Sequence, residues 1–156
     1  MPARNLTLAC RTPQETAAFG AALADLLEPG DTLLLSGDLG TGKSHLARSL
    51  IRAHIGAAED VPSPTFTLVQ TYDTPAFEIW HADLYRLGSV QEVEELGLTE
   101  AFDTAVCLIE WPDRLGTLVP ENALSIGLQP GPDDDTRQLT LAWRDARWDG
   151  KLSKWR

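Results

Sequence analysis

The sequence has few cysteines, no long hydrophobic run and few basic residues. Its two cysteines, Cys10 and Cys107, are far apart and form no C-x-x-C pair, so we expect two buried, reduced thiols and no disulfide. No apolar run approaches the ~20 residues of a membrane-spanning helix, and the first residues contain none long enough for a signal peptide. These shortages predict a cytoplasmic protein that does not contact a membrane.

The shortage of basic residues bears on nucleic-acid binding. The chain has 13 Lys and Arg against 23 Asp and Glu, which gives a formal net charge of −10. Nucleic-acid affinity comes largely from Lys and Arg that displace counterions, so strong direct binding of RNA or DNA is disfavoured. Residues 144–156 are basic instead, and two interpretations stay open for them: a solvated surface, or a docking surface for an acidic partner or an RNA.

Length and pattern indicate one α/β domain over residues 1–156, with 144–156 as a basic C-terminal tail. At 156 residues and 43% hydrophobic composition, the chain can fill a single core. Short apolar runs alternate with helical apolar spacing, which predicts a mixed β-sheet flanked by helices in three layers. The expected strands are 6–9, 32–36, 68–72, 77–85, 105–109, 123–129 and 137–143. The expected helices are 13–28, 43–54 and SVQEVEELGL from Ser89, where Ser89 and Glu92 form a capping box.

Residues 36–45 read SGDLGTGKSH and match G-x-x-x-x-G-K-[ST]. The match lies between an apolar strand and a helix, the context of a phosphate-binding loop. Backbone N–H groups would face the phosphates at the helix N-terminus. Lys43 would bridge the β- and γ-phosphates, and the Ser44 hydroxyl would hold Mg²⁺. This predicts a P-loop NTPase-like fold that binds nucleotide through Gly37, Asp38, Leu39, Gly40, Thr41, Gly42, Lys43 and Ser44.

Two acids and one threonine are candidates to complete the site. Glu110 directly follows the apolar run AVCLI, and Asp83 lies in FEIWHADLYR; ligands gather at the carboxyl ends of strands in open α/β sheets. Alternatively, Glu110 would cap a turn and Asp83 would pair with Arg86. Thr65, in the proline-rich loop VPSPTF, would either reach Mg²⁺ or the γ-phosphate or be an ordinary turn residue. The functional interpretation gives the catalytic set Lys43, Glu110, Thr65 and Asp83, with Ser44 and Glu110 as metal ligands.

The remaining candidates are aromatic residues and histidines. Trp111 follows Glu110 and precedes a proline, so it would cover the nucleotide, contact a partner or belong to the core. His45 and His81 have no partner at the spacing of a zinc site. We therefore expect no zinc centre.

Four motifs together resemble one family. GDLGTGKS, SPTFTLV, HADLYRL and IEWPDRL occur in this order, and over residues 12–143 the chain resembles the bacterial TsaE (YjeE) family of small P-loop ATPases. That resemblance implies ATP and Mg²⁺ as cofactors, with Ser44 where the family more often has threonine. It also implies that the nucleotide region is contacted by Asp83, Trp111 and Arg137, with Thr12 and Pro13 near the base.

The resemblance also implies partners. The family serves threonylcarbamoyladenosine modification of tRNA, alongside the paired transferase subunits of the TsaB and TsaD families, which would hold most of the tRNA. The ATPase would reset that complex as a partner-activated switch. Weak hydrolysis is expected of the isolated chain, because it has no evident arginine finger unless Arg86 serves as one. A kinase for a small metabolite and a non-catalytic nucleotide sensor remain as alternatives.

Overall fold

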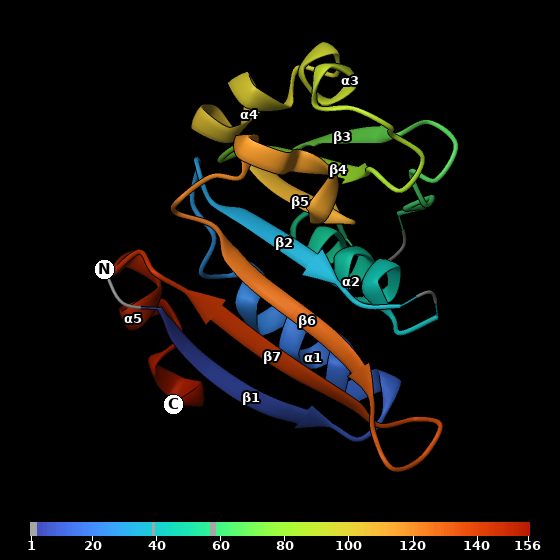
Figure 1. Ribbon diagram of the computed structural model, residues 1–156. Coiled ribbons are helices and arrows are strands. Elements are labelled where there is room, and N and C mark those ends of the chain that lie inside the picture. The colour runs from blue at the N-terminus through green and yellow to red at the C-terminus, as the bar shows by residue number, and fades with distance from the viewer. Residues whose placement is uncertain (1–2, 39, 57–58) are drawn as a thin grey trace.

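The described residues form a seven-stranded mixed sheet with helices on both faces. The structure is a computed structural model, and it describes residues 3–38, 40–56 and 59–156 (Figure 1). The strand order is β1-β7-β6-β2-β5-β4-β3. The strands are β1 (Arg4–Cys10), β2 (Thr32–Ser36), β3 (Val69–Asp73), β4 (Glu78–Asp83), β5 (Val106–Glu110), β6 (Leu124–Pro130) and β7 (Arg137–Trp143). The helices are α1 (Pro13–Ala24), α2 (Lys43–Ile55), α3 (Val90–Glu95), α4 (Leu98–Thr104), α5 (Arg147–Lys151) and the 3₁₀ segments η1 (Pro112–Leu118) and η2 (Ser153–Trp155).

The centre of the sheet is parallel. Strand β2 lies between β5 and β6 and runs parallel to both, and β4 runs parallel to β5. The outer strands β3, β7 and β1 pair antiparallel with their neighbours. The carboxyl ends of β2, β4 and β5 therefore meet at one edge of the sheet, where a ligand is expected in an open α/β fold.

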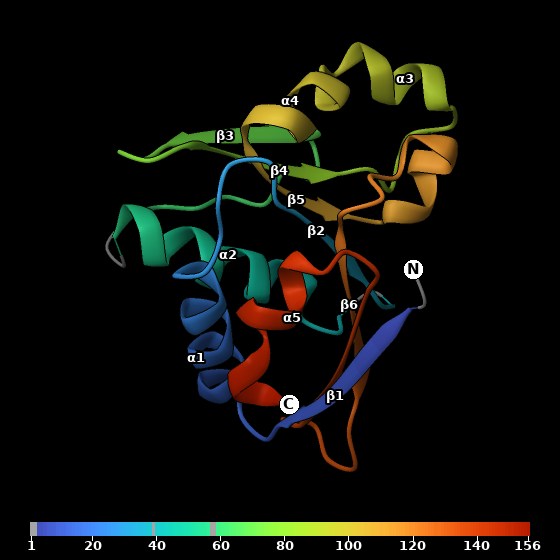
Figure 2. The ribbon, with the colours of Figure 1, turned by 90° about the vertical axis from the view of Figure 1, so that its left-hand side faces the viewer.

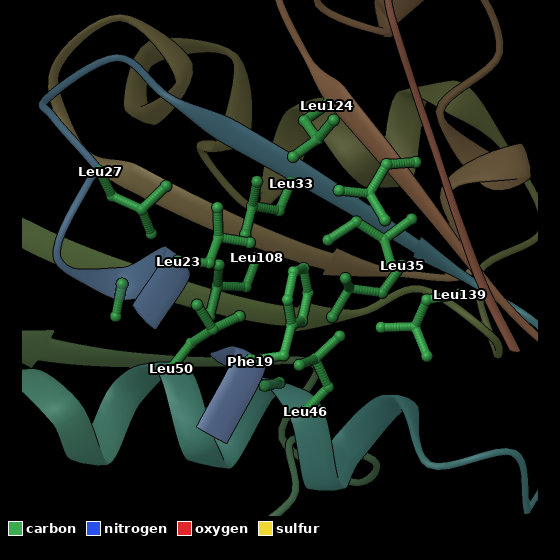
Figure 3. Packing of buried hydrophobic residues seen from close by; sticks show 14 of the residues in the cluster. Phe19, Leu23, Leu27, Leu33, Leu35, Leu46, Leu50, Leu108, Leu124 and Leu139 are labelled. Carbon is green, nitrogen blue, oxygen red and sulfur yellow. The ribbon is translucent and has the colours of Figure 1, made fainter. Parts of the chain in front are cut away.

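The run TLLLS explains the layers. Leu33 and Leu35 point into a core shared with α1 and α2, whereas Leu34 points into a second core beneath α3 and α4, as period-two alternation requires. Figure 3 shows the first of these cores, with Phe19 among the leucines of the sheet and α2. Figure 2 shows the two groups of helices on opposite sides of the sheet. The predicted three-layer α/β fold is confirmed.

Two predicted helices differ from those observed. The first ends at Ala24, earlier than the predicted residue 28, and the next residues form a turn. The helix that begins after Ser89 has the expected capping box with Glu92, but it stops at Glu95. Gly97 then takes a left-handed conformation with φ of 83° and starts α4. A Cβ at Gly97 would lie 3.6 Å from the Trp80 ring, so α3 and α4 turn over that ring.

The basic C-terminal segment is part of the domain. The Trp148 side chain is fully buried in the core of α1 and α2, and its indole N–H donates to the Asn122 carbonyl at 2.8 Å. Arg147 and Lys151 donate to the buried carboxylate of Asp31 at 3.1 and 2.6 Å. The interpretation of residues 144–156 as a solvated surface is therefore wrong for Trp148 and Lys151, whereas the Arg147 side chain stays exposed while it contacts Asp31.

Candidate functional site

The glycine-rich loop joins the end of β2 to α2. Gly37 has φ of 141°, and a Cβ there would lie 2.5 Å from the Leu128 carbonyl oxygen and 2.7 Å from Thr41 Oγ1. Only glycine fits between the loop and β6. Gly42 is the N-cap of α2 and has no side chain that could satisfy the first helical N–H groups. Those groups are donors for an anion at a helix N-terminus.

Lys43 is the first residue of α2, and its side chain folds back onto the glycine-rich loop. Its Nζ donates to the Gly37 carbonyl and, at 3.1 Å, to the Asp38 carbonyl. It also lies 4.2 Å from the centroid of the Trp111 ring. Burial lowers the pKa of Lys43, while the nearby carboxylates of Glu110, Asp83 and Asp38 act in the opposite direction. A cation so poorly hydrated attracts phosphate oxygens strongly.

Glu110 connects β5 to the helix that follows the loop. Ser44 Oγ lies 3.1 Å from Glu110 Oε1 and 3.3 Å from Oε2. On its other side, His81 Nε2 lies 2.7 Å from Oε2. Glu110 is the last residue of β5 and is 2% exposed. The alternative in which Glu110 caps a turn is not what these contacts show.

Asp83 lies beside Glu110 because of the sheet register. The parallel pairing of β4 and β5 places Asp83 opposite Glu110. Thr65 Oγ1 donates to Asp83 Oδ2 at 3.3 Å, and the Tyr85 amide donates to Oδ1 at 3.0 Å. The Arg86 guanidinium lies instead 4.6 Å from the centroid of the exposed Phe66 ring. The alternative pairing of Asp83 with Arg86 is therefore not the arrangement observed.

These side chains surround a cavity of about 290 Å³ at the carboxyl edge of the sheet. The structure thus brings most of the predicted site residues together. The lining contains eight predicted residues, Gly40, Gly42, Lys43, Ser44, Thr65, Asp83, Glu110 and Trp111, and two others, His45 and Arg48.

Six predicted residues are outside this lining, namely Gly37, Asp38 and Thr41 of the loop together with Arg137, Thr12 and Pro13. Arg137 Nε donates to the Thr41 carbonyl at 3.0 Å and so supports the loop from β7. Thr12 caps α1 through the Glu15 amide. The Pro13 carbonyl lies 2.9 Å from His45 Nε2, which attaches the start of α1 to the helix behind the loop. The predicted residue Leu39 lies outside the described residues.

Sequence reasoning missed Arg48 and undervalued His45 and His81. Arg48 is four residues after Ser44 on α2, so it lies on the same face of that helix. His81 is two residues before Asp83 on a strand and shares its face. The spacing of Arg48 from Ser44 and that of His81 from Asp83 are visible in the sequence. Neither spacing identifies a site unless the tertiary contacts are known.

The oxygen donors of this site suit a hard divalent cation. The Ser44 hydroxyl and the Glu110 carboxylate are adjacent, and Asp83 and Thr65 follow on the next strand and loop. Among the described residues there is no cluster of three or more His, Cys, Asp or Glu side chains that could hold a metal by themselves. Hydroxyl and carboxylate oxygens are the kind of ligand that Mg²⁺ takes from a protein, together with water and phosphate oxygens.

A larger hollow of about 680 Å³ lies at the opposite edge of the sheet, where β6 begins and β7 ends. Its lining includes Val119, Pro120, Ala142 and Trp143. It has neither a glycine-rich loop nor the paired hydroxyl and carboxylate. The smaller cavity is therefore the candidate site.

In the part of the chain that the structure describes, no helix has the length and apolar character to cross a membrane.

The strand, loop and helix define the P-loop class of nucleotide-binding proteins. A family model described as "Threonylcarbamoyl adenosine biosynthesis protein TsaE" matches residues 10–139. The chain belongs to the TsaE family, which confirms the resemblance found in its motifs.

Relatives and a solved structure agree. The "tRNA threonylcarbamoyladenosine biosynthesis protein TsaE" of Rickettsia bellii (strain RML369-C) is 43% identical over 128 residues, which is 82% of this chain and 88% of that protein. The protein of the same name from Bacillus subtilis (strain 168) is 36% identical over 130 residues, 83% of this chain and 80% of that protein. The crystal structure of Bacillus subtilis YdiB superposes with a TM-score of 0.82 at 28% identity, covering 99% of this chain and 95% of that one.

Proposed function

We propose that this chain is the ATP-binding and Mg²⁺-dependent ATP-hydrolysing component of the machinery that makes N6-threonylcarbamoyladenosine at position 37 of tRNA. The relatives named above carry the tRNA modification in their names. The observation that supports hydrolysis is the pair formed by Ser44 Oγ and Glu110 Oε1 at 3.1 Å, directly beside Lys43.

The loop and the polar residues at the strand ends have separate roles in this proposal. The amides of loop 37–44 and the Lys43 ammonium hold the phosphates, and the neutralised charge lowers the barrier to phosphoryl transfer. Ser44 and Glu110 would hold Mg²⁺, and the bound cation would supply positive charge to the phosphate oxygens. Asp83 and Thr65 face the same space and orient water or sense the γ-phosphate. Arg137 keeps the loop in place through the Thr41 carbonyl.

The proposed output is a change in a partner complex. The cavity is small and its lining is taken up by groups suited to nucleotide and cation. A nucleotide-dependent switch needs no second substrate, only a loop whose conformation depends on the γ-phosphate. We place the paired transferase subunits of the TsaB and TsaD families as the partners, with tRNA held mainly by them because this chain is acidic. Hydrolysis then resets the transferase complex between turnovers.

The test is phosphate release from Mg·ATP by the chain alone, by the paired transferase subunits alone, and by the mixture. We expect slow release by the chain alone and much faster release by the mixture, with Lys43→Ala removing the gain. A chain that is already fast alone and unaffected by the subunits would refute the switch. Transfer of labelled γ-phosphate to a metabolite instead of water would show a kinase.

A further inference from the structure

His81 is a fully buried imidazole directly behind the candidate cation site. Its side chain is 0% exposed, and Nε2 lies 2.7 Å from Glu110 Oε2. Strand alternation places Ile79, His81 and Asp83 on the face of β4 that looks toward α2. The ring therefore lies one strand away from Glu110 and on its side of the sheet, since Asp83 is the register partner of Glu110.

The two ring nitrogens differ in their surroundings. An ionised carboxylate only accepts hydrogen bonds, so the Nε2–H donates to Glu110. Nδ1 is buried and has no hydrogen-bond partner among the described residues. The contact with Glu110 is thus the only hydrogen bond of the ring among the described residues, and Nε2 is the nitrogen that faces the carboxylate.

This bond fixes the direction of the Glu110 carboxylate. Glu110 is 2% exposed, and a buried carboxylate needs donors in place of water. His81 holds Oε2 from behind, and Ser44 lies on the other side, nearest to Oε1. The carboxylate cannot rotate away from Ser44 without losing the His81 bond. Donors behind a metal-binding carboxylate commonly set metal affinity in this way.

We propose that His81 is a positioning residue that sets how tightly the Ser44–Glu110 pair binds the divalent cation of a bound nucleotide. This rests on the proposed function, in which that pair holds Mg²⁺. His81 touches neither cation nor nucleotide; it acts through Glu110. A purely structural histidine would change stability but leave the Mg²⁺ dependence of nucleotide binding unchanged.

The experiment compares three substitutions. His81→Gln keeps an N–H at the reach of Nε2, His81→Asn keeps an amide one methylene shorter, and His81→Leu removes the donor. His54→Gln is the matched control, since His54 contacts the Ala24 carbonyl outside the cavity. Binding of a fluorescent, non-hydrolysable ATP analogue is measured in EDTA and with rising Mg²⁺, and thermal unfolding is measured without nucleotide.

Rising Mg²⁺ should strengthen binding of the ATP analogue, and we expect His81→Asn and His81→Leu to need about 10–100-fold more Mg²⁺ to reach half of that increase. Their binding of the analogue in EDTA should equal that of the parent. His81→Gln should need only a few-fold more, and His54→Gln should match the parent. If His81→Leu destabilises the fold, the comparison of His81→Gln with His81→Asn tests the inference by itself. Equal Mg²⁺ dependence in all variants overturns the inference. Failure of the parent chain to bind the analogue overturns the proposed function instead.

Discussion

Replacing Gly37 by alanine tests the close approach of the glycine-rich loop to β6. The new Cβ would lie 2.5 Å from the Leu128 carbonyl oxygen and 2.7 Å from Thr41 Oγ1. Leu128 pairs with Leu139 in the sheet, which restricts how far its carbonyl can move. The positive φ costs about 1–3 kcal/mol for a residue other than glycine, and overpacking adds about 1–3 kcal/mol. Since the loop can shift to relieve part of the clash, we expect a loss of about 2–4 kcal/mol.

The assay combines thermal unfolding with nucleotide binding. For a domain of this size each kcal/mol corresponds to roughly 2–4 °C, so Gly37→Ala should lower Tm by about 5–15 °C. A loop displaced from its amide geometry should also bind a fluorescent ATP analogue at least tenfold more weakly, by analogy with the cost of losing preorganised donors.

Gly56→Ala is the matched control for this prediction. Gly56 has φ of 110°, but a Cβ there would meet no atom of the described residues within 4 Å. It should therefore show the cost of the positive φ alone and leave nucleotide binding unchanged. If Gly37→Ala loses no more stability than Gly56→Ala and binds nucleotide normally, the steric argument for Gly37 is wrong.

Three further predictions concern stability and reactivity. Asp31→Asn should lower the free energy of unfolding in urea by about 1–3 kcal/mol. The loss is smaller than for a fully buried ion pair, because Arg147 and Lys151 are partly exposed. An unchanged urea midpoint of unfolding would contradict this prediction. The hydrogen bond from the Trp143 indole N–H is the chief cause that lowers the pKa of Asp149 in the folded state. The ionised Asp149 therefore contributes its full stabilisation above its ordinary pKa of 3.8, and the contribution is lost as pH falls through the lowered pKa. The Tm difference between the parent and Asp149→Asn should therefore shrink in acid, and a constant difference would refute the assignment. Burial raises the pKa of Cys107 to about 12, so a thiol reagent at pH 8 should modify it only as fast as the protein unfolds, and faster modification would show an open path to the thiol.

The central features of the fold were predictable from local patterns. The run TLLLS is apolar at successive positions, which is typical of a strand covered on both faces, and the glycine-rich motif follows it at once. Helix α2 then begins at Lys43 as predicted. Short stretches of sequence predict the glycine-rich loop, Ser44 and the strand that ends at Glu110. These three features set the position of the site.

Contacts between distant segments were not predictable. The buried carboxylate of Asp31 binds Arg147 and Lys151, which lie more than a hundred positions later. The charge pattern alone left open a solvated surface or a docking surface. The bond between His81 and Glu110 depends on the parallel register of β4 with β5. Composition does not determine register, and a shift by one residue would turn His81 to the other face.

The N-terminal strand also contacts residues that are far from it in the sequence. Strand β1 lies at the edge and pairs with β7, residues 137–143, and the core above that half of the sheet includes Trp148 and Leu152. During synthesis, β1 therefore leaves the ribosome long before its hydrogen-bonding partner exists. The apolar side of β1, with Leu6 and Leu8, waits for nearly the whole chain to emerge, and such exposed intermediates are prone to aggregate. The pairing of β1 is thus a late step in folding, because it cannot precede the synthesis of residues 137–143.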